Sequence, residues 1–291
     1  MTTTAPSAED ARPRLLAVAF RMLGDAAEAE DAVQEAYARW YRQTDDERAD
    51  VREPAAWLTT VTSRICLDVL GSARHRRETY VGPWLPEPLP AHSPVVAPDP
   101  ADLAVLGESV DLAVLVALEA LTPGQRVAWV LHDVFAVPFE QVAEAVGRTP
   151  QACRTLASAA RRALRSDRRV TATREEHARA VAAFQAACLT GDLGALVAVL
   201  DPSVALVSDG GGVVSAARRP VRGADQVARF LLGLLTRRSG AQVDVGEVGG
   251  RTVAVVSEHG TVDTVLALGV TDGVVSDVWV MRNPRKLAAW G

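Results

Sequence analysis

Three groups of side chains in this 291-residue chain have the types and spacing to bind charged partners. The first is acidic, because Glu28, Asp31 and Glu35 share one face of a predicted helix. The second is the basic run Arg74-His75-Arg76-Arg77 at the end of another predicted helix. The third is an arginine-rich helix predicted after Thr149. Carboxylates suit a basic protein surface and clustered arginines suit phosphates, so these groups indicate recognition of a protein and of nucleic acid.

The acidic face has two explanations. It could be an ordinary solvated helix face with ion pairs one turn apart, as on most charge-rich helices. Its charges are nearly uniform in sign, however, and like charges at this spacing cost roughly 0.2–0.5 kcal/mol per pair. A partner surface carrying arginines would relieve that repulsion, which favours a docking face.

The helix that ends in the basic run also carries candidate base-contacting side chains. Favourable charge at a helix C-terminus explains one or two of its arginines. The whole cluster fits phosphate contacts better, and its arginines are Arg74, Arg76 and Arg77. Trp57, with Thr60 and Arg64 one and two turns further on, could stack on and hydrogen-bond to bases of a separated strand. For Trp57 the alternative is an ordinary core position.

A helix–turn–helix pattern contains the third group. A short helix predicted over 138–146 is followed by Gly147, and Thr149 and Pro150 then supply a cap and a first turn. The first turns of such a second helix meet base edges, and later arginines reach phosphates. The candidates for base contacts are Arg148, Gln151, Arg154, Thr155 and Ser158. The candidates for phosphate contacts are Arg161, Arg162 and Arg165. A plain Ala/Arg-rich surface helix is the alternative.

Other chemistry has little support in the sequence. The three cysteines are far apart and the five histidines form no HxH or HExxH pair, so we expect neither a disulfide nor a metal site. There is no GxSxG or GxxxxGK[ST] motif, and we expect no catalytic residue and no cofactor. Without a bilayer-spanning run or a secretion signal, the expected location is cytoplasmic, with no membrane partner. The net charge of −5 does not exclude nucleic acid, because the arginines cluster locally.

Composition divides the chain into four stretches. Residues 10–79 and 108–168 read as helical, with a helix over 14–23, a second capped by Asp25 and a third starting at Pro54. Residues 80–107 begin with a proline-crowded run, which predicts an extended linker. Residues 174–291 contain helices predicted around 177–188 and 227–234. The strand-like runs in this last stretch are 204–208, 243–245, 252–257, 261–268 and 274–280.

Together these residues resemble the sigma-70 family factors of the extracytoplasmic function (ECF) type. Residues 19–40 are similar to the polymerase-binding helices of region 2, residues 56–70 to its −10-element helix, and residues 122–165 to region 4. The linker Tyr80-Val-Gly-Pro-Trp84-Leu-Pro86-Glu-Pro88, the turn Asp209-Gly-Gly-Gly212 and the segment Asn283-Pro-Arg-Lys-Leu287 look like motifs of one group. That group, the SigJ-type proteins, carries a SnoaL-like C-terminal domain. Val213 departs from it, since the glycine motif there often continues into a basic residue.

The resemblance implies a multidomain fold. It has two all-α sigma domains, the region 2 helical bundle and the region 4 helix-turn-helix, plus a C-terminal α+β SnoaL-like domain of the cystatin-like cone type. It implies an alternative sigma factor, not an enzyme, that binds core RNA polymerase through the β′ clamp helices and β flap. Such a factor reads the −10 and −35 elements of promoter DNA. The residues that would contact the clamp helices are Glu28, Asp31, Gln34 and Glu35. The loop 43–53 with Trp57, Thr60 and Arg64 would hold the melted −10 strand.

The resemblance also implies regulation in cis, by an intramolecular contact of the C-terminal domain with the sigma domains. The candidates for that contact are Asp209, Gly210, Gly211, Gly212, Asn283, Pro284, Arg285, Lys286 and Leu287. Two other functions stay open. A SnoaL-like enzyme would need a general base, and Asp209, Glu258, His259 and Asp263 form no persuasive acid–base pair. A ligand-sensing helix-turn-helix regulator would leave residues 14–77 unexplained.

Overall fold

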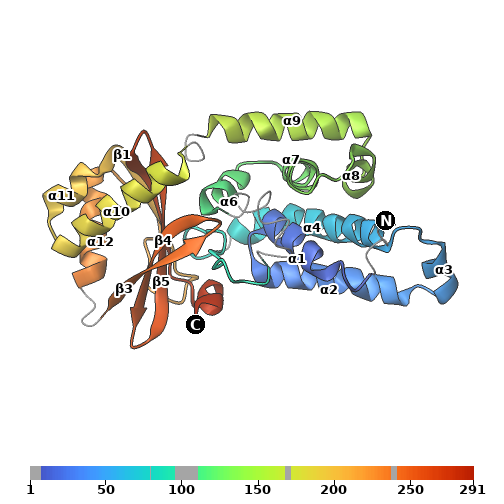
Figure 1. The fold of residues 1–291 in the computed structure, drawn as a ribbon, viewed down its shortest axis with the longest axis horizontal. Helices are drawn as coiled ribbons and strands as arrows, with labels where there is room; N and C mark the ends of the chain where they lie inside the picture. Colours follow the sequence, from blue (N-terminus) through green and yellow to red (C-terminus); the bar gives the residue numbers. More distant parts are fainter. Residues whose placement is uncertain (1–7, 79, 96–110, 168–171, 237–240) are drawn as a thin grey trace. The chain divides into compact units, whose positions relative to one another are not determined.

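The computed structural model describes residues 8–78, 80–95, 111–167, 172–236 and 241–291 (Figure 1). The chain forms two compact units. The first comprises Met1–Arg76, Pro94–Ser109 and Leu118–Ala163. The second comprises Arg77–Ser93, Val110–Ala117 and Leu164–Gly291. Among the described residues, no helix combines the length and apolar character needed to span a membrane.

The first unit begins with a four-helix group: α1 (Arg12–Leu23), α2 (Ala26–Arg42), α3 (Asp45–Asp50) and α4 (Pro54–Glu78). Gly24 ends α1 with a φ of 72°, a left-handed conformation that glycine adopts without strain. Asp25 caps α2, and its Oδ1 accepts a 3.0 Å hydrogen bond from the amide of Glu28. The helix starts expected from the sequence are therefore confirmed to within two residues.

Helix α3 lies inside the segment that was expected to be a loop. Its signal is a reciprocal capping box, in which the Glu47 amide donates to the Thr44 hydroxyl and the Thr44 amide donates to the Glu47 carboxylate. This Thr-x-x-Glu spacing is visible in the sequence and was missed. The helix has no buried residue, so the cap and not packing defines it.

The helix–turn–helix is formed by α8 (Phe139–Val146) and α9 (Pro150–Ser166), after α7 (Pro123–Trp129) and a short π-helix η2 (Val130–Val134). Gly147 closes α8 with a φ of 69°, and the Thr149 hydroxyl accepts from the Ala152 amide at 3.2 Å. The turn and cap expected here are confirmed. Helix α9 packs through Cys153, Ala157, Ala160 and Leu164, which repeat at helical spacing and leave its polar side exposed.

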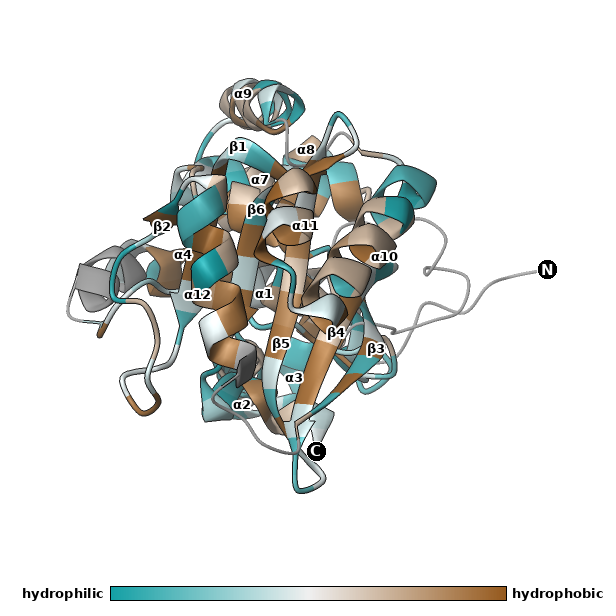
Figure 2. Ribbon diagram, turned by 90° about the vertical axis from the view of Figure 1, so that its left-hand side faces the viewer, coloured by the Kyte–Doolittle hydropathy of each residue, from teal (hydrophilic) through white to brown (hydrophobic). Residues whose placement is uncertain are grey.

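The second unit is a six-stranded mixed sheet with the order β2-β1-β6-β5-β4-β3. The β1–β6 pair is parallel and the other pairs are antiparallel. The strands are β1 (Leu200–Asp209), β2 (Val221–Arg222), β3 (Gln242–Val248), β4 (Arg251–Glu258), β5 (Thr261–Thr271) and β6 (Val274–Met281). The helices that cover one face of this sheet in Figure 2 are α10 (Arg174–Thr190), α11 (Leu193–Ala198) and α12 (Ala224–Thr236). This confirms the α+β expectation, while the short α11 and β2 were missed.

Both faces of this sheet are buried. On one face, Leu206, Leu268 and Val278 pack with the helices in one apolar cluster. On the other, Trp279 and Met281 pack with Leu85 of the linker in a second cluster. That second cluster also contains residues of α6 (Leu112–Leu118) and of the 3-10 helix η4 (Pro284–Trp290). A sheet covered on both faces needs apolar residues at successive positions, which explains the valine-rich runs in place of strict alternation.

The proline-crowded segment has no helix or strand over residues 80–90, as its prolines predict. It is not a loose spacer, however. Leu85 and Leu89 are only 3% and 2% exposed, and the Trp290 indole donates a 2.6 Å hydrogen bond to the Pro88 carbonyl. Residues 85–90 are all buried within the second unit.

Candidate nucleic-acid and polymerase interfaces

Helix α9 presents its polar side to solvent. The exposed candidates are Arg148, Gln151, Arg154, Thr155, Ser158 and Arg162. Arg154 is held in place, since its Nη2 donates to Glu140 at 3.2 Å and its guanidinium lies 5.2 Å from the centroid of the Phe139 ring. Arg161 is half-buried and forms a 2.9 Å ion pair with Asp133. The structure thus groups the predicted base-contacting residues on one open surface of a recognition-type helix.

Helix α4 places its candidates differently. Trp57 is half-buried, and its ring centroid lies 5.2 Å from that of Trp40. Thr60 was expected to be accessible to bases, and that placement is wrong, because Thr60 is only 8% exposed. Thr59, Thr62 and Ser63 are buried beside it, with hydroxyls of Thr59 and Ser63 bonded to carbonyls one turn earlier. The middle of α4 is therefore surrounded by protein on more sides than its sequence suggests.

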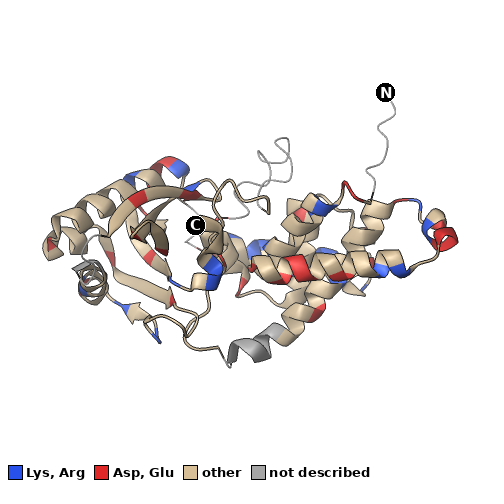
Figure 3. Cartoon of the chain, turned by 90° about the horizontal axis from the view of Figure 1, so that it is seen from below, with Lys and Arg blue, Asp and Glu red and all other residues tan. Residues whose placement is uncertain are grey.

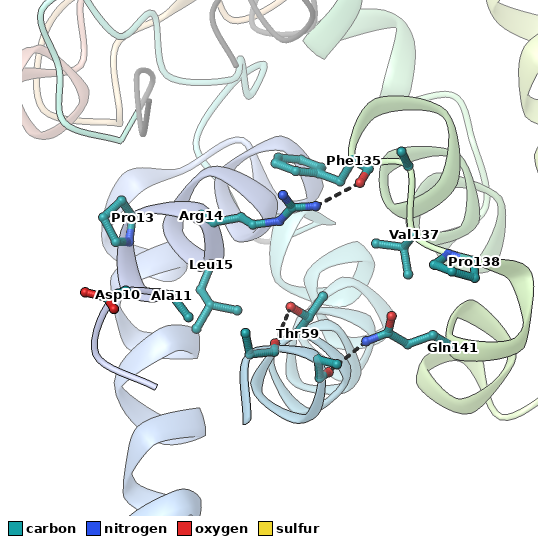
Figure 4. Close-up of a pocket in the computed structure, with 13 residues that line it drawn as sticks. Asp10, Ala11, Pro13, Arg14, Leu15, Thr59, Phe135, Val137, Pro138 and Gln141 are labelled. Carbon is teal, nitrogen blue, oxygen red and sulfur yellow. Dashed lines mark hydrogen bonds between the residues drawn. The ribbon is translucent and has the colours of Figure 1, made fainter. Parts of the chain in front are cut away.

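Helix α8 covers part of α4 within the first unit. The Nε and Nη2 atoms of Arg64 donate to the Glu144 carbonyl at 3.1 and 2.8 Å. Gln141 donates from Nε2 to the Ala56 carbonyl at 2.9 Å. Figure 4 shows Gln141 reaching towards the start of α4, beside Thr59. These hydrogen bonds are called the α4–α8 contact below.

Two arginines tie the same helical groups together elsewhere. Arg14 of α1 donates to the Phe135 carbonyl at 2.9 Å, beside a cavity of about 360 Å³ drawn in Figure 4. Arg126 of α7 is 4% exposed and donates to the Met22 carbonyl at 3.1 Å and to Glu119 at 2.7 Å. Burial lowers the pKa of Arg126 to about 10, so its guanidinium stays charged at neutral pH.

The basic run at the end of α4 lies on helical backbone. Its side chains, Arg74, His75, Arg76 and Arg77, are outside the described residues. The phosphate contacts expected there therefore remain a prediction.

The acidic residues of α2 lie along the helix with basic residues near its end (Figure 3). Asp31 and Gln34 are exposed, and Glu28 and Glu35 are half-buried. The expectation that these acids lack basic partners is wrong for Glu35, which pairs with Arg39 at 2.8 Å and Arg42 at 3.5 Å. The hydrogen bond from Arg39 holds the pKa of the Glu35 carboxyl below its ordinary value. Of the four predicted polymerase contacts, the exposed ones are thus the anionic Asp31 and the neutral Gln34.

In the second unit, Asp209 is the centre of a buried polar cluster. It is 0% exposed, and its carboxylate accepts four hydrogen bonds. Oδ1 accepts from the Tyr80 hydroxyl at 2.7 Å and the Gly211 amide at 2.9 Å. Oδ2 accepts from the Leu85 amide at 3.0 Å and from Lys286 Nζ at 2.9 Å. Two of these donors belong to the linker, so Asp209 fastens the linker to the sheet.

Lys286 completes this arrangement from the other end of the chain. It is 4% exposed, its Nζ also donates to the Leu85 carbonyl, and Nζ lies 4.1 Å from the centroid of the Trp84 ring. Asn283 donates to the Tyr80 hydroxyl at 3.0 Å, and a Cβ on Gly211 would lie 2.5 Å from Asn283. We call this cluster the linker clasp; its members are Tyr80, Leu85, Asp209, Gly211, Asn283 and Lys286.

The clasp brings together much of the set expected to make a regulatory contact. Gly210 is buried in the same turn, and Leu287 packs in the apolar cluster below. Gly212, Pro284 and Arg285 stay largely exposed. Sequence reasoning missed the partners Tyr80 and Leu85. The available signal was that a buried aspartate needs several donors, and that Lys286 is the chain's only lysine.

Two protein families match the two helical groups of the first unit, α1–α4 and the helices around the helix–turn–helix. The sigma-70 region 2 family matches residues 8–77, and the sigma-70 region 4 family matches residues 111–164. The ECF RNA polymerase sigma factor SigJ of Mycobacterium tuberculosis strain H37Rv is 41% identical over 290 residues, covering 96% of this chain and 91% of that protein. The probable ECF sigma factor SigI of strain CDC 1551 is 37% identical over 283 residues, covering 95% and 92%.

A solved structure extends the agreement to the fold. The crystal structure of the M. tuberculosis ECF sigma factor SigJ covers 97% of each chain with 38% identity and a TM-score of 0.72. A helical group that precedes a helix-turn-helix, with each matching a sigma-70 region, defines a sigma-70-type factor. The chain belongs to the ECF RNA polymerase sigma factors. It is an alternative sigma factor for transcription initiation and not an enzyme, and the region 2 match accounts for helices that a helix-turn-helix repressor would leave unexplained.

Proposed function

We propose that this sigma factor reads its promoter with two helices in different states of readiness. Helix α9 reads the −35 element from an open surface, and α4 holds the melted −10 strand after α8 has moved away. The observation that carries the proposal is the contrast between the exposed polar side of α9 and the α4–α8 contact.

For the −35 element, the first turns of α9 supply the base contacts. Gln151 and Arg148 are exposed at the N-terminal end, where a recognition helix enters the major groove. Glutamine suits adenine and arginine suits guanine through paired hydrogen bonds. Arg162 lies about three turns after Gln151 and is exposed, so it is positioned to contact a phosphate.

For the −10 element, Trp57 offers a half-buried ring on α4, two turns before Arg64 and shortly after the loop that contains α3. Stacking on such a ring contributes about 1–3 kcal/mol per base. Arg64 is exposed but hydrogen-bonded to the Glu144 carbonyl, so its guanidinium is fully released to contact DNA when α8 leaves. The basic run at 74–77 would then contact phosphates on the same strand.

For polymerase, α2 is the docking helix. Its exposed Asp31 and Gln34, with Glu28 and Glu35 beside them, present a mainly acidic face to the β′ clamp helices. Region 4 would dock on the β flap. Binding of α2 and of region 4 at separate places on polymerase would separate α4 from α8, which couples polymerase binding to exposure of the −10 contacts.

Regulation in cis would act through the linker clasp. The linker joins regions 2 and 4, and its residues 80–90 are fastened to the second unit by Asp209 and Lys286. The length of chain free to span the two promoter elements therefore depends on whether the clasp is closed. The proposed regulatory contact is thus with the linker.

The experiment is run-off transcription on genomic fragments with core polymerase and the full-length protein. Charge reversal of the docking face by Asp31→Arg should abolish both pull-down of core polymerase and transcription. Glu175→Arg, a charge reversal on exposed α10, is the matched control and should leave both intact. A wild-type protein that neither binds core polymerase nor selects start sites would refute the proposal.

A further inference from the structure

The second unit contains a cavity that takes no part in the proposed promoter recognition. It has a volume of about 400 Å³ and lies between α10, α12 and the strands β3, β4 and β5. Small-molecule sites in proteins commonly have volumes of about 300–1,000 Å³. The cavity is on the helix-covered face of the sheet, whereas the linker clasp is on the other face.

The lining of this cavity is apolar apart from Gln185, Cys188 and Thr264. Ala254 and Leu266 form part of its wall and are only 8% and 7% exposed. Among the described residues, none that lines the cavity carries an acidic, basic or imidazole side chain. An ion entering such a site would lose its hydration without gaining a partner, so the lining selects for uncharged molecules.

The same lining argues for binding and against catalysis. Its titratable group is Cys188, and burial raises the pKa of that thiol to about 12. The thiol therefore stays protonated at neutral pH and is a poor nucleophile. None of the four candidate general bases, Asp209, Glu258, His259 and Asp263, lines the cavity.

The mouth of the cavity is apolar as well. Leu189, Val243 and Val245 line it and are 79%, 42% and 66% exposed. Among the described residues these are three of the six large apolar or aromatic side chains that are exposed. Removing these apolar side chains from water lowers the free energy, so an apolar molecule that fills the cavity and covers its mouth would be stabilised there.

We propose that this cavity binds an uncharged, mainly apolar small molecule. Gln185, which is half-buried, is the polar group placed to orient it. The inference is independent of promoter recognition, because none of the residues involved belongs to α2, α4, α9 or the linker clasp.

The test uses the full-length protein and N-phenyl-naphthylamine, an uncharged apolar probe whose fluorescence rises in apolar surroundings. Saturable one-to-one binding is expected. Val245→Glu places a charge at the mouth, on a side chain that is already 66% exposed, and should weaken binding about tenfold or more. Val213→Glu is the matched control, since Val213 is 71% exposed and does not line the cavity; its affinity should equal that of the wild type.

A second measurement locates the probe. A protonated thiol reacts slowly with a maleimide, so the labelling is followed over hours; Cys188 should be labelled first in the folded protein, because it is half-buried while Cys66 and Cys153 are buried. Bound probe should slow this labelling several-fold. The proposal would be overturned if the probe showed no saturable binding or bound the two glutamate variants with equal affinity. It would also be overturned if bound probe left the labelling rate of Cys188 unchanged. A wild-type dimer that Val245→Glu dissociates, without probe binding, would assign the mouth to an interface between copies and would also overturn it.

Discussion

Helices α9 and α4 carry similar polar side chains but use them differently. On α9, Gln151, Thr155 and Ser158 are exposed to solvent. On α4, Thr60 is buried and Arg64 is bonded to a carbonyl of α8. The linker clasp is a second case of polar groups held inside the protein, around the fully buried Asp209. Residue type therefore identifies groups able to bind DNA. Burial, as at Thr60, or a hydrogen bond within the protein, as at the exposed Arg64, distinguishes the groups that are already engaged in the free protein.

The largest expected effect is a loss of stability on disrupting the buried linker clasp. Lys286→Met removes the charge that faces Asp209 and leaves its carboxylate buried without a cation. Breaking a buried pair in this way costs about 3–5 kcal/mol. Hydrogen–deuterium exchange of the β6 peptide, measured in the full chain, should show a loss of protection of that size. Arg285→Ala, at the exposed neighbouring residue, should change protection by less than about 0.5 kcal/mol.

On the exposed side, the expected effect is on binding and not on folding. Gln151→Ala should weaken binding of the −35 element by about 1–3 kcal/mol and relax preference at one base pair. Stability should be unchanged, because Gln151 is exposed. Electrophoretic mobility shifts with the holoenzyme measure the first effect, and thermal unfolding measures the second. If Gln151→Ala lowered the stability but not the affinity for DNA, Gln151 would be a residue that stabilises the fold and not one that contacts DNA.

The α4–α8 contact gives a smaller effect of opposite sign. Gln141→Leu removes the donor to the Ala56 carbonyl, and one hydrogen bond contributes about 0.5–1.5 kcal/mol. Free protein should then bind single-stranded promoter DNA roughly two- to tenfold more tightly, as fluorescence anisotropy would detect. Glu144→Gln is the control, since the acceptor there is the backbone carbonyl and the side chain is exposed. Equal affinities for the two variants would mean that α8 does not restrict α4.

The smallest effect is on the pH dependence of stability and concerns His177, a buried residue of α10 that faces β5. Burial lowers the pKa of His177, and its Nε2 lies 3.1 Å from the Leu268 carbonyl. The unfolded chain binds this proton more readily, so stability is complete above about pH 6.5 and falls as the pH drops towards the lowered pKa. The slope from this residue is at most about 1.4 kcal/mol per pH unit. His177→Gln should flatten the wild-type profile of unfolding free energy below about pH 6.5. If the two profiles stay parallel there, His177 is not the cause of the pH dependence.

Local features of the fold could be predicted from the sequence. Caps at Asp25 and Thr149 and the turn at Gly147 act between near neighbours, so their residue types are sufficient. The strand runs of the second unit were visible as valine-rich segments. Helix α3 and the Glu35–Arg39 pair were equally local and could have been found from spacing alone.

The contacts that define the state of α4 could not be predicted in this way. Arg64 and Glu144 are 80 residues apart, and the acceptor is a backbone carbonyl that any residue at position 144 would supply. The same holds for Gln141 with Ala56 and Arg126 with Met22. Such contacts leave no pattern of paired residue types in the sequence. The linker clasp was partly visible, because Asp209 and Lys286 stood out by type, but their linker partners depend on the tertiary fold.

The distance between α4 and α8 in the free and polymerase-bound protein tests the central claim most directly. Spin labels at Asp68→Cys on α4 and Glu144→Cys on α8 occupy exposed positions, and Cys188→Ser removes the half-buried native thiol. Double electron–electron resonance should show one short distance in the free protein and a longer one with core polymerase. The same distance distribution in both states would contradict the account.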